Sequence, residues 1–487
     1  MPLEDIRAER VKKLELLKAD GGDPYPARTA RTHAIADIRK KFAALVRAKK
    51  TVVAAGRVMA RREHGGSMFM DLSDGSGIIQ AYLKKDILGE AYARAEDTLD
   101  IGDFIEAEGT LFTTKKEEQT IEVSRWAMLA KSLLPLPEKW HGLQDTEERF
   151  RKRYLDLLMN EGVTERFLMR SRIIKIIRDF HEERGFVAVE TPIFHPIPGG
   201  TLAKPFVTRH HALDIDLYLR IAKELYLKRL LVAGFERIYE IGPDFRNEGI
   251  DATHNPEFTM LESYAAYWDE EDMMAFVEDL FVSLAKGFNK KGEVAADGKP
   301  IVFRKPFARI AFKDVLARYA QISQYDAETR DSLAVRARQL GIDAAPHESK
   351  GKIADEIYKK ICRPHLVQPT FVVNHPLDIS PLAKHHEKNP DEVRRFQLIA
   401  GGMELTNAFA ELNDPIDQRE RFMAQERERE GGDEEAMRLD EDFLEAMEYG
   451  MPPAAGLGIG IDRVVMLLTG VKNIREVVLF PTMRPKL

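Results

Sequence analysis

The sequence predicts an α+β protein, with a small N-terminal β-barrel domain and a large domain built on an antiparallel sheet flanked by helices. Two observations support this class. From Thr51, apolar and polar residues alternate in the order of three strands, a helix and two more strands, whereas the later strands are irregularly spaced between helices. A parallel sheet would need strands and helices in regular alternation. The 487 residues are enough for roughly three domains.

Composition excludes several classes of protein. The single cysteine, Cys362, excludes a disulfide framework and any multi-cysteine metal site, and it fits a reducing, cytoplasmic location. No stretch approaches the roughly 18 consecutive apolar residues that span a bilayer, so we expect no membrane segment. The first residues, "MPLEDIRAER", have no apolar signal core.

The charge distribution predicts one basic surface on an acidic protein. The net charge of −7 argues against a general nucleic-acid binder. The stretch from Arg28 to Arg62, however, holds eleven lysine and arginine residues and one acid, Asp37. Such a stretch is a candidate surface for phosphate contacts. The alternative is a solvated helix face without a partner.

The first third of the chain predicts a helical segment, a barrel and a linker. Residues 1–48 predict helices with a break at "GGDPYP", where glycine and proline interrupt the pattern. Residues 49–135 predict the strand order of an OB-fold, a small, partly open barrel that binds single-stranded nucleic acid. The stretch 136–150, which follows a proline-containing segment, predicts a linker.

Residues 151–487 predict the large domain. It opens with a helix over 163–185, in which Phe167, Ile173, Ile177 and Phe180 recur at helical spacing. A helix-rich insertion is expected over 269–365. Strands are predicted at 186–192, 237–246, 257–267, 370–376, 402–412 and 476–481.

The strand "EFTMLESY" carries a carboxylate among apolar side chains. Alternate residues of a strand share a face, which groups Phe258, Met260, Glu262 and Tyr264. A carboxylate buried there costs several kcal/mol unless a cation, a metal or hydrogen-bond donors compensate it. The guanidinium of Arg246, shortly before this strand, suits a phosphate. A ligand site and a structural Arg–Glu pair inside the sheet both remain open at this point.

Two further stretches gather polar groups and glycines. "GMELTNAFAELND" puts Asn407, Phe409 and Glu411 on one strand face, and strict alternation puts Glu404 on the opposite face unless the strand contains a bulge. In "GLGIGIDR", three alternating glycines leave one strand face without side chains, so that a flat ligand has room on the backbone. This spacing is neither a dinucleotide-binding fingerprint nor a P-loop.

Together these stretches resemble a known family. "FRNE", "GLGIGIDR" and a helix and strand ending in "ETPI" resemble the three motifs of class II aminoacyl-tRNA synthetases. "HGLQDTEERFRKRYLDLL", "HNPEFTMLESY" and "QPTFVVNHPLDISPLAK" are similar to the lysine-specific, bacterial branch of this family, and the resemblance covers nearly the whole chain. It implies a ligase that activates L-lysine with ATP to lysyl-adenylate and pyrophosphate. Lysine would then pass to the 3′-hydroxyl of the terminal adenosine of tRNA(Lys).

The resemblance also implies the site residues of the catalytic domain. Arg246 and Arg463 would be catalytic and bind the α- and γ-phosphates of ATP, with Glu248, His254, Asn255 and Phe258 around the nucleotide. The substrate lysine would contact Gly200 (or Gly199), Glu224, Tyr264, Asn407 and Glu411. Two carboxylates and a phenol suit an ammonium group, which donates three hydrogen bonds. Relatives that activate aspartate need a cation instead, and activation of aspartate or asparagine is the nearest alternative.

The implied metal site departs from the family pattern. Magnesium would be held by Glu404, but the second acidic position, seven residues earlier, holds Gln397. A neutral amide oxygen ligates magnesium without contributing a charge. We therefore expect ordinary activity with a raised magnesium requirement.

In the barrel, the resemblance implies that Phe69 stacks on an anticodon base while Arg62, Gln80 and Glu118 contact base edges. The alternative for Phe69 is a residue of the barrel core. The helix and strand ending at Pro192 resemble the class II dimer motif, so we expect a homodimer, although the apolar residues of the helix fit a core equally well.

Two other functions are weighed. A catalytically silent paralogue that only binds RNA would not need Arg246, Glu404, Glu411 and Arg463, all of which are present. A paralogue that attaches lysine to a protein would lack the OB domain.

Overall fold

The computed structural model describes residues 2–137, 143–289, 291–296, 299–346 and 348–486. The chain forms two units, Met1–Leu143 and Gln144–Leu487. Part of the predicted linker, 138–142, lies outside the described residues. The linker prediction extended too far, because α6 (Thr146–Arg151) begins inside it. Asp145 caps this helix by accepting hydrogen bonds from the backbone N–H groups of Glu147 and Glu148.

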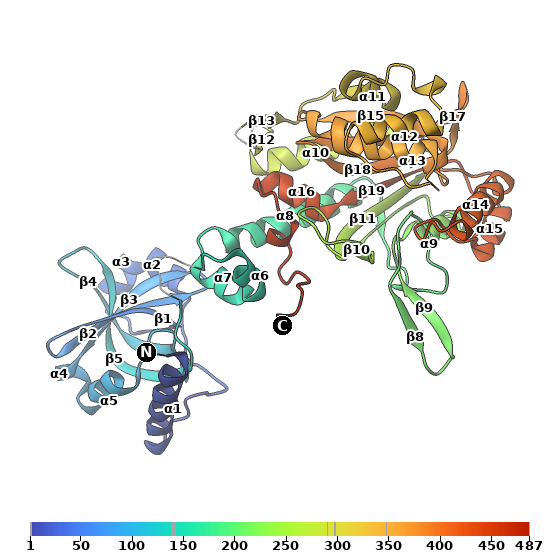
Figure 1. Ribbon diagram of the computed structural model, residues 1–487. Coiled ribbons are helices and arrows are strands. Elements are labelled where there is room, and N and C mark those ends of the chain that lie inside the picture. Colours follow the sequence, from blue (N-terminus) through green and yellow to red (C-terminus); the bar gives the residue numbers. More distant parts are fainter. Residues whose placement is uncertain (1, 138–142, 290, 297–298, 347, 487) are drawn as a thin grey trace. The chain divides into compact units, whose positions relative to one another are not determined.

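The first unit contains the predicted OB barrel. Five strands close in the order β1-β2-β3-β5-β4 (Figure 1). Methionine and branched aliphatic side chains alternate inward along them, including Met68, Met70 and Leu72 of one strand. The strands are β1 (Val52–His64), β2 (Ser67–Asp74), β3 (Gly77–Lys84), β4 (Phe104–Thr113) and β5 (Gln119–Ala130).

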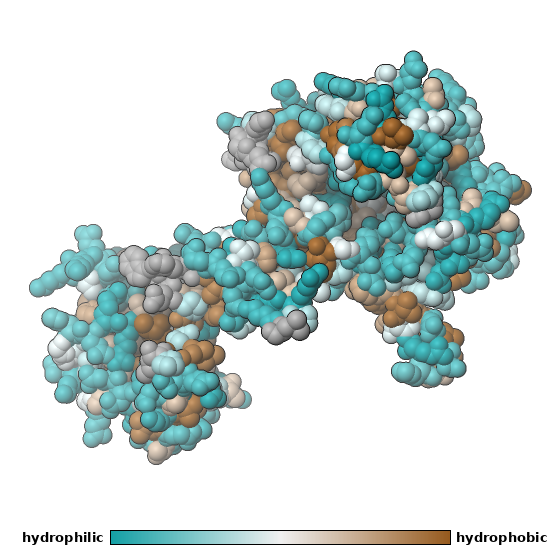
Figure 2. All heavy atoms as spheres, in the orientation of Figure 1, coloured by the Kyte–Doolittle hydropathy of each residue, from teal (hydrophilic) through white to brown (hydrophobic). Residues whose placement is uncertain are grey.

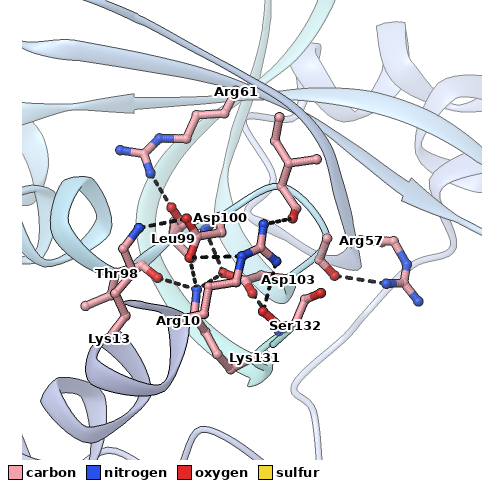
Figure 3. A network of polar contacts seen from close by, with 12 residues as sticks. Arg10, Lys13, Arg57, Arg61, Thr98, Leu99, Asp100, Asp103, Lys131 and Ser132 are labelled. Atoms are coloured by element: carbon pink, nitrogen blue, oxygen red, sulfur yellow. Dashed lines mark hydrogen bonds and ion pairs between the residues drawn. The ribbon is translucent and has the colours of Figure 1, made fainter. Parts of the chain in front are cut away.

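Short helices surround the barrel, and a buried ion cluster joins them to it. The predicted break at "GGDPYP" separates the first helix from the next two. Lys131 is buried against Asp100 and Asp103, and Arg10 of the first helix donates to the backbone carbonyls of Ser132, Leu134 and Ile101 (Figure 3). The helices are α1 (Leu3–Ala19), α2 (Ile35–Lys40), α3 (Phe42–Arg47), α4 (Lys85–Leu88) and α5 (Glu90–Thr98).

The second unit is built on a nine-stranded, mainly antiparallel sheet, as predicted. Its order is β14-β15-β17-β18-β19-β11-β10-β6, with β16 paired to β17, and only β14–β15 and β10–β6 run parallel. The strands are β6 (Val187–Ala188), β10 (Arg237–Phe245), β11 (Glu257–Ala266), β14 (Ala308–Ala311), β15 (Thr370–Pro376), β16 (His385–His386), β17 (Asn389–Ala400), β18 (Met403–Ala410) and β19 (Ala454–Gly460).

One face of this sheet carries the main hydrophobic core. Helices α8 (Val163–Glu182), α10 (Glu270–Phe288) and α16 (Ile461–Thr469) pack against it through residues such as Ile173, Leu280 and Val465. Leu261 and Leu457 of the central strands face the same core. Because strand residues alternate, their neighbours Glu262 and Gly458 face the other side of the sheet.

The predicted insertion over 269–365 needs correction. Helix α10 belongs to the main core and β14 pairs with β15, so the insertion proper is the later part. That part has its own core, formed by α11 (Phe312–Ala320), α12 (Arg330–Gln339), α13 (Lys350–Ile357) and the π-helix η2 (Tyr358–Cys362). A two-stranded sheet, β12 (Glu293–Ala296) with β13 (Lys299–Val302), precedes it.

Two strand predictions were wrong. Residues 476–481 contain no strand, since the 3₁₀ turn η5 (Ile474–Glu476) ends there and Val477 enters the main core from a loop. The strand expected over 186–192 is limited to β6, because the Thr191 N–H donates to the side chain of Glu240 and not to a backbone carbonyl of β10. A short apolar run fits either a strand or a buried loop.

The remaining elements lie at the edges of the second unit. The sheet β7-β9-β8 contains the hairpin of β8 and β9, which projects from the main sheet in Figure 1. The face seen in Figure 2 is mostly hydrophilic, with separate apolar patches. These elements are β7 (Phe194–His195), β8 (Val207–His210), β9 (Ile215–Leu219), α7 (Arg153–Met159), α9 (Glu224–Val232), α14 (Pro415–Glu430), α15 (Glu441–Glu448), η1 (Tyr325–Ala327), η3 (Arg363–His365) and η4 (Leu377–Ile379). Within the described residues, no helix has the length and apolar character needed to cross a membrane.

Candidate active site

A cavity of about 380 Å³ lies on the sheet face opposite the main core. Its floor is formed by β11, β18 and β19, and its walls come from α9, α13 and the turn at η4. The bare backbone of Gly456, Gly458 and Gly460 lines part of the floor. A Cβ at Gly456 would collide with Glu411 Oε1 and the ring of Tyr264, so glycine there makes room for both side chains.

A β-bulge in β18 brings the floor's polar groups to one face. Gln397 pairs with Asn407 and Leu398 with Thr406, but Ile399 pairs with Glu404, so Leu405 is the extra residue. The bulge reverses the alternation at that point. Glu404, Asn407 and Gln397 therefore all line the cavity. The sequence pattern left such a bulge open without showing one, and the structure contains it.

At one end of the cavity, arginines and aromatic rings lie together. The guanidinium of Arg246 lies 5.0 Å from the ring centroid of Phe258. Arg463 Nη2 lies 3.2 Å from His254 Nε2, and Arg463 Nη1 donates to the carbonyl of Glu404 at 3.4 Å. A flat aromatic surface beside two guanidinium groups suits a nucleotide, with a base against the ring and phosphates near the cations.

At the other end, two carboxylates, Glu224 and Glu411, contact one buried ammonium, and Glu262 and Tyr264 lie beside them. Lys228 Nζ lies 2.5 Å from Glu224 Oε1 and also pairs with Glu411. The Tyr264 hydroxyl donates to Glu262 Oε2 at 3.2 Å, and the backbone N–H of Lys223 donates to Glu262 Oε1 at 2.9 Å. Burial raises the pKa of Glu262 to about 7 and raises the pKa of Glu411 well above its ordinary value. The excess of acids suits a cationic ligand.

The barrel presents aromatic and polar side chains on its outer surface. Phe69 stacks on Tyr82 with ring centroids 4.6 Å apart, and Tyr82 lies 6.0 Å from Phe112. Phe69 points away from the barrel core, because its neighbours Met68 and Met70 are the buried residues of β2. The alternative of a core position for Phe69 is therefore wrong. Stacked rings on an outer face offer a platform for nucleic-acid bases.

The other residues predicted for base contacts come from neighbouring strands. Arg62 is the cross-strand partner of Phe69 and pairs with Asp71 at 2.9 Å. Gln80 accepts a hydrogen bond from the Thr120 hydroxyl at 3.0 Å. Glu118 is exposed in the turn that precedes β5. The barrel thus carries all four predicted residues on its strands or at a strand end.

Comparison with known families decides what kind of protein this is. The family described as tRNA synthetases class II (D, K and N) matches residues 145–484. The chain belongs to the class II tRNA synthetases. The family described as OB-fold nucleic acid binding domain matches residues 52–129, which are the barrel of this synthetase.

The synthetase is similar over its full length to several lysine–tRNA ligases. It is 48% identical over 484 residues to a lysine–tRNA ligase of Carboxydothermus hydrogenoformans, covering 99% of each chain. It is 49% identical over 490 residues to a lysine–tRNA ligase of a Roseiflexus species, covering 100% of each chain. A lysine–tRNA ligase of Moorella thermoacetica is 48% identical over 482 residues, covering 99% of this chain and 98% of that protein.

The synthetase brings most of its predicted catalytic-domain residues to the one cavity. Glu411 is the exception: it does not line the cavity, and it is buried against Lys228 on the same side of the Gly456 backbone as Tyr264. The predicted residues that line the cavity are Gly200, Glu224, Arg246, Glu248, His254, Asn255, Phe258, Tyr264, Gln397, Glu404, Asn407 and Arg463.

Several residues in or beside the synthetase's cavity were not predicted as site residues. Glu262 was recognised as a carboxylate that needs compensation, but the strand pattern gave it no ligand. Lys228 sits one helical turn after Glu224, a spacing that on its own indicates an ordinary surface pair. Arg395 donates to Asn407 Oδ1 at 2.8 Å and to Ser380 Oγ at 2.9 Å. Its strand, β17, was not predicted.

Glu404 and Gln397, the residues expected at the magnesium position, both line the cavity. Glu404 Oε2 lies 3.5 Å from Arg363 Nη1, and Gln397 Oε1 accepts a hydrogen bond from the Tyr358 hydroxyl at 3.0 Å. Burial would raise the pKa of Glu404, but the surrounding cations, led by Arg463, lower it. Nowhere in the described chain do three or more His, Cys, Asp or Glu gather as a metal site. One carboxylate and one amide still fit magnesium, which takes its other ligands from phosphates and water.

Proposed function

We propose that the chain is the ligase that joins L-lysine to tRNA(Lys) in two steps. The first forms lysyl-adenylate and pyrophosphate from lysine and ATP, and the second transfers lysine to the 3′-hydroxyl of the terminal adenosine. The observation that carries this proposal is the acidic end of the cavity, where Glu224 and Glu411 share one buried lysine, Lys228, and a third carboxylate, Glu262, accepts a hydrogen bond from Tyr264. A substrate ammonium supplies the missing positive charge, and an aspartate side chain would be repelled.

The lysine side chain is bound by its charge and its donors. In the proposal the ammonium donates to Glu224, Glu411 and Tyr264, and Asn407 holds the backbone groups of the substrate beside Gly200. Arg395 fixes the Asn407 amide through its oxygen. The substrate carboxylate then points toward the arginine end of the cavity. This arrangement holds the reacting groups together and lowers the entropic part of the barrier.

The arginine end is proposed to bind ATP. Phe258 and Arg463 hold the adenine between them, with Glu248, His254 and Asn255 around the nucleotide. Arg246 binds the α-phosphate and Arg463 the γ-phosphate. The lysine carboxylate attacks the α-phosphorus in line and pyrophosphate leaves. Arg246 stabilises the negative charge that develops on the α-phosphate oxygens, so no enzymic nucleophile is required.

Magnesium is proposed as the cofactor, held by Glu404 with Gln397 beside it. When bound, it supplies positive charge next to the phosphate oxygens. The chain's own contribution is to orient Glu404, which lies between Arg363 and Arg463.

The barrel is proposed to bind the anticodon. Phe69, already stacked on Tyr82, offers its ring to a base. Arg62, Gln80 and Glu118 contact base edges, and the basic stretch from Arg28 to Arg62 contacts phosphates. Most of its cations, such as Arg39, Lys40 and Lys50, are exposed.

We also propose that the ligase acts as a cytoplasmic homodimer. Support comes from apolar side chains that are exposed in the described chain around the segment ending at Pro192: Leu168 is 65% exposed and Val187 51%. Burying such side chains against a second copy removes apolar surface from water. Gel filtration tests this, and a fully active monomer at low protein concentration would refute it.

Pyrophosphate exchange tests the proposed reaction. The chain is incubated with ATP, magnesium and labelled pyrophosphate, without tRNA, and with lysine, aspartate or asparagine in turn. Exchange with lysine alone is the expected result. Exchange with aspartate or asparagine would mean that the acidic end of the cavity does not select the side chain. No exchange with any of them would leave an RNA-binding role as the better explanation.

A further inference from the structure

Lys228 is a buried cation with no role in the proposed reaction. It lies on α9 one turn after Glu224, its side chain is 0% exposed, and it does not line the cavity. Its Nζ contacts Glu224 and Glu411, which come from different elements of the fold. Burial would lower the pKa of Lys228, but the two carboxylates raise it above its ordinary value, so the side chain carries a charge.

Lys228 does not supply a hydrogen-bond donor to every oxygen of the carboxylates around it. Glu411 Oε1 has no hydrogen-bond partner within the described residues, although the side chain is 2% exposed. A buried carboxylate oxygen without a donor is costly. The neighbouring Glu262 is held by one backbone N–H and the Tyr264 hydroxyl, and no cation pairs with it in the described chain. The cluster therefore has acceptors left for a second ammonium.

We propose that Lys228 is the positioning residue that sets the specificity of the lysine pocket. Its ammonium holds Glu224 and Glu411 side by side and oriented, so that the substrate ammonium enters as the second cation of a prepared cluster. This rests on the proposed function, because it takes lysine as the substrate.

The physical reason is the repulsion between carboxylates. Both groups contact one nitrogen atom, so without that nitrogen they face each other at short range. Like charges at such a distance do not both stay ionised, and the pair takes up a proton. A substrate ammonium would then have to displace this proton before it could bind. The other possible role of Lys228 is only to compensate buried charge for stability, and this role predicts no selective effect on lysine.

Calorimetric titration separates the two roles. We expect the variant Lys228→Met to bind L-lysine at least about tenfold more weakly than the unmodified chain, while its affinity for ATP stays the same. Leu280→Ala is the matched control for stability, since Leu280 is buried in the main core and does not line the cavity. It should lower the unfolding temperature without changing lysine affinity.

Methylammonium gives a second readout, which a stability role would not affect. In the unmodified chain this small cation can only compete with lysine, so it should weaken lysine binding. In Lys228→Ala, which removes the aliphatic part of the side chain together with the ammonium, it can occupy the vacated space, so it should strengthen lysine binding. Opposite effects in the two proteins are the expected result.

Two outcomes would overturn the proposal: unchanged lysine affinity in Lys228→Met, or equal losses of affinity for lysine and for ATP. If Lys228→Met does not fold, Lys228→Gln keeps a hydrogen-bond donor on a side chain one atom shorter, and the same two outcomes decide. Failure of the proposed function would look different, because the unmodified chain itself would then not bind lysine.

Discussion

Each unit of the chain buries a lysine between two carboxylates, and the two clusters differ in how completely their charges are matched. In the barrel, Lys131 donates to Thr98 O at 2.7 Å, Asp100 Oδ2 at 2.5 Å and Asp103 Oδ2 at 2.8 Å, which uses all three of its donors (Figure 3). Lys13 pairs with Oδ1 of Asp100, and the Ser132 N–H donates to Oδ1 of Asp103. We call this cluster closed, because the three donors of Lys131 and both oxygens of each carboxylate have partners.

The cluster in the catalytic unit is open. Lys228 meets two carboxylates there, a third lies beside them, and Glu411 Oε1 has no partner in the described chain. The same type of ion pair thus serves two purposes. Where every donor and acceptor is used, it ties elements of the fold together. Where acceptors are left over, it prepares a site for a ligand that brings the missing donors.

The largest effect is expected from removing a charge of the open cluster. Glu411→Gln leaves Lys228 and the substrate ammonium with one carboxylate fewer between them. Breaking a buried pair costs about 3–5 kcal/mol, so kcat/KM for lysine in pyrophosphate exchange should fall at least about 100-fold. KM for ATP is the internal control and should change little. A loss of less than about threefold would show that Glu411 has no part in lysine binding.

The same kind of change in the closed cluster should affect stability instead. Lys131→Met leaves Asp100 and Asp103 without their shared cation and should destabilise the barrel unit by about 3–5 kcal/mol. Thermal unfolding followed by calorimetry measures this. Lysine-dependent pyrophosphate exchange without tRNA should remain at the level of the unmodified chain. A parallel loss of exchange would contradict the division of roles between the clusters.

A change on the outer face of the barrel should alter only the tRNA step. Phe69→Ala removes the stacking platform beside Tyr82, and stacking on one base is worth about 1–3 kcal/mol. KM for tRNA in aminoacylation should therefore rise roughly 5- to 150-fold, with pyrophosphate exchange unaffected. Met70→Leu, a change inside the barrel core, is the control. If Phe69→Ala aminoacylates tRNA normally, the anticodon role of this face is wrong.

The open cluster should also respond to pH. Burial raises the pKa of Glu262 to about 7. The ionised form favours the substrate ammonium, so lysine affinity should be full above pH 7 and fall by up to about tenfold per pH unit below it. Titrations from pH 6 to pH 8 measure this. The variant Glu262→Gln should bind lysine with a flatter pH dependence, and an unchanged slope would assign the proton to another group.

The smallest effect is expected at the metal position. Gln397→Glu adds a charge near Glu404 and should lower the magnesium concentration for half-maximal exchange by roughly threefold or more. The Tyr358 hydroxyl, which donates to Gln397, can donate equally to a carboxylate. An unchanged magnesium concentration for half-maximal exchange would show that the Gln397 amide does not weaken magnesium binding.

Sequence patterns predicted the architecture well because it depends on local periodicity. The barrel order and the strands β10, β11, β15 and β18 follow from alternation that is visible in the chain. Residues 476–481 were misjudged because a short apolar run fits either a strand or a buried loop. The projecting hairpin was missed because its strands bury little: Val207 is 60% exposed and Leu213, between them, 64%.

A site residue was predictable from its type alone where the type implies its chemistry, as for Arg246, whereas Glu224 was predicted only through the family resemblance. What the sequence could not predict is which side chains meet across elements. The position of Lys228 between Glu224 and Glu411 depends on how α9 packs against the end of β18. Nothing in the spacing of residues 228 and 411 encodes that contact, so only the three-dimensional structure reveals it.

The bulge at Leu405 divides β18 into two halves, and the alternation of cavity-facing residues shifts by one position between them. Odd-numbered residues after the bulge face the cavity, as Asn407 does, whereas before it an even-numbered residue, Glu404, faces the cavity. The residues that face the cavity are thus set independently in the two halves. Deleting Leu405 would turn Glu404 away from the cavity and leave Asn407 in place. A single residue therefore separates the two parts of the strand. Mutation and selection can act on each part independently.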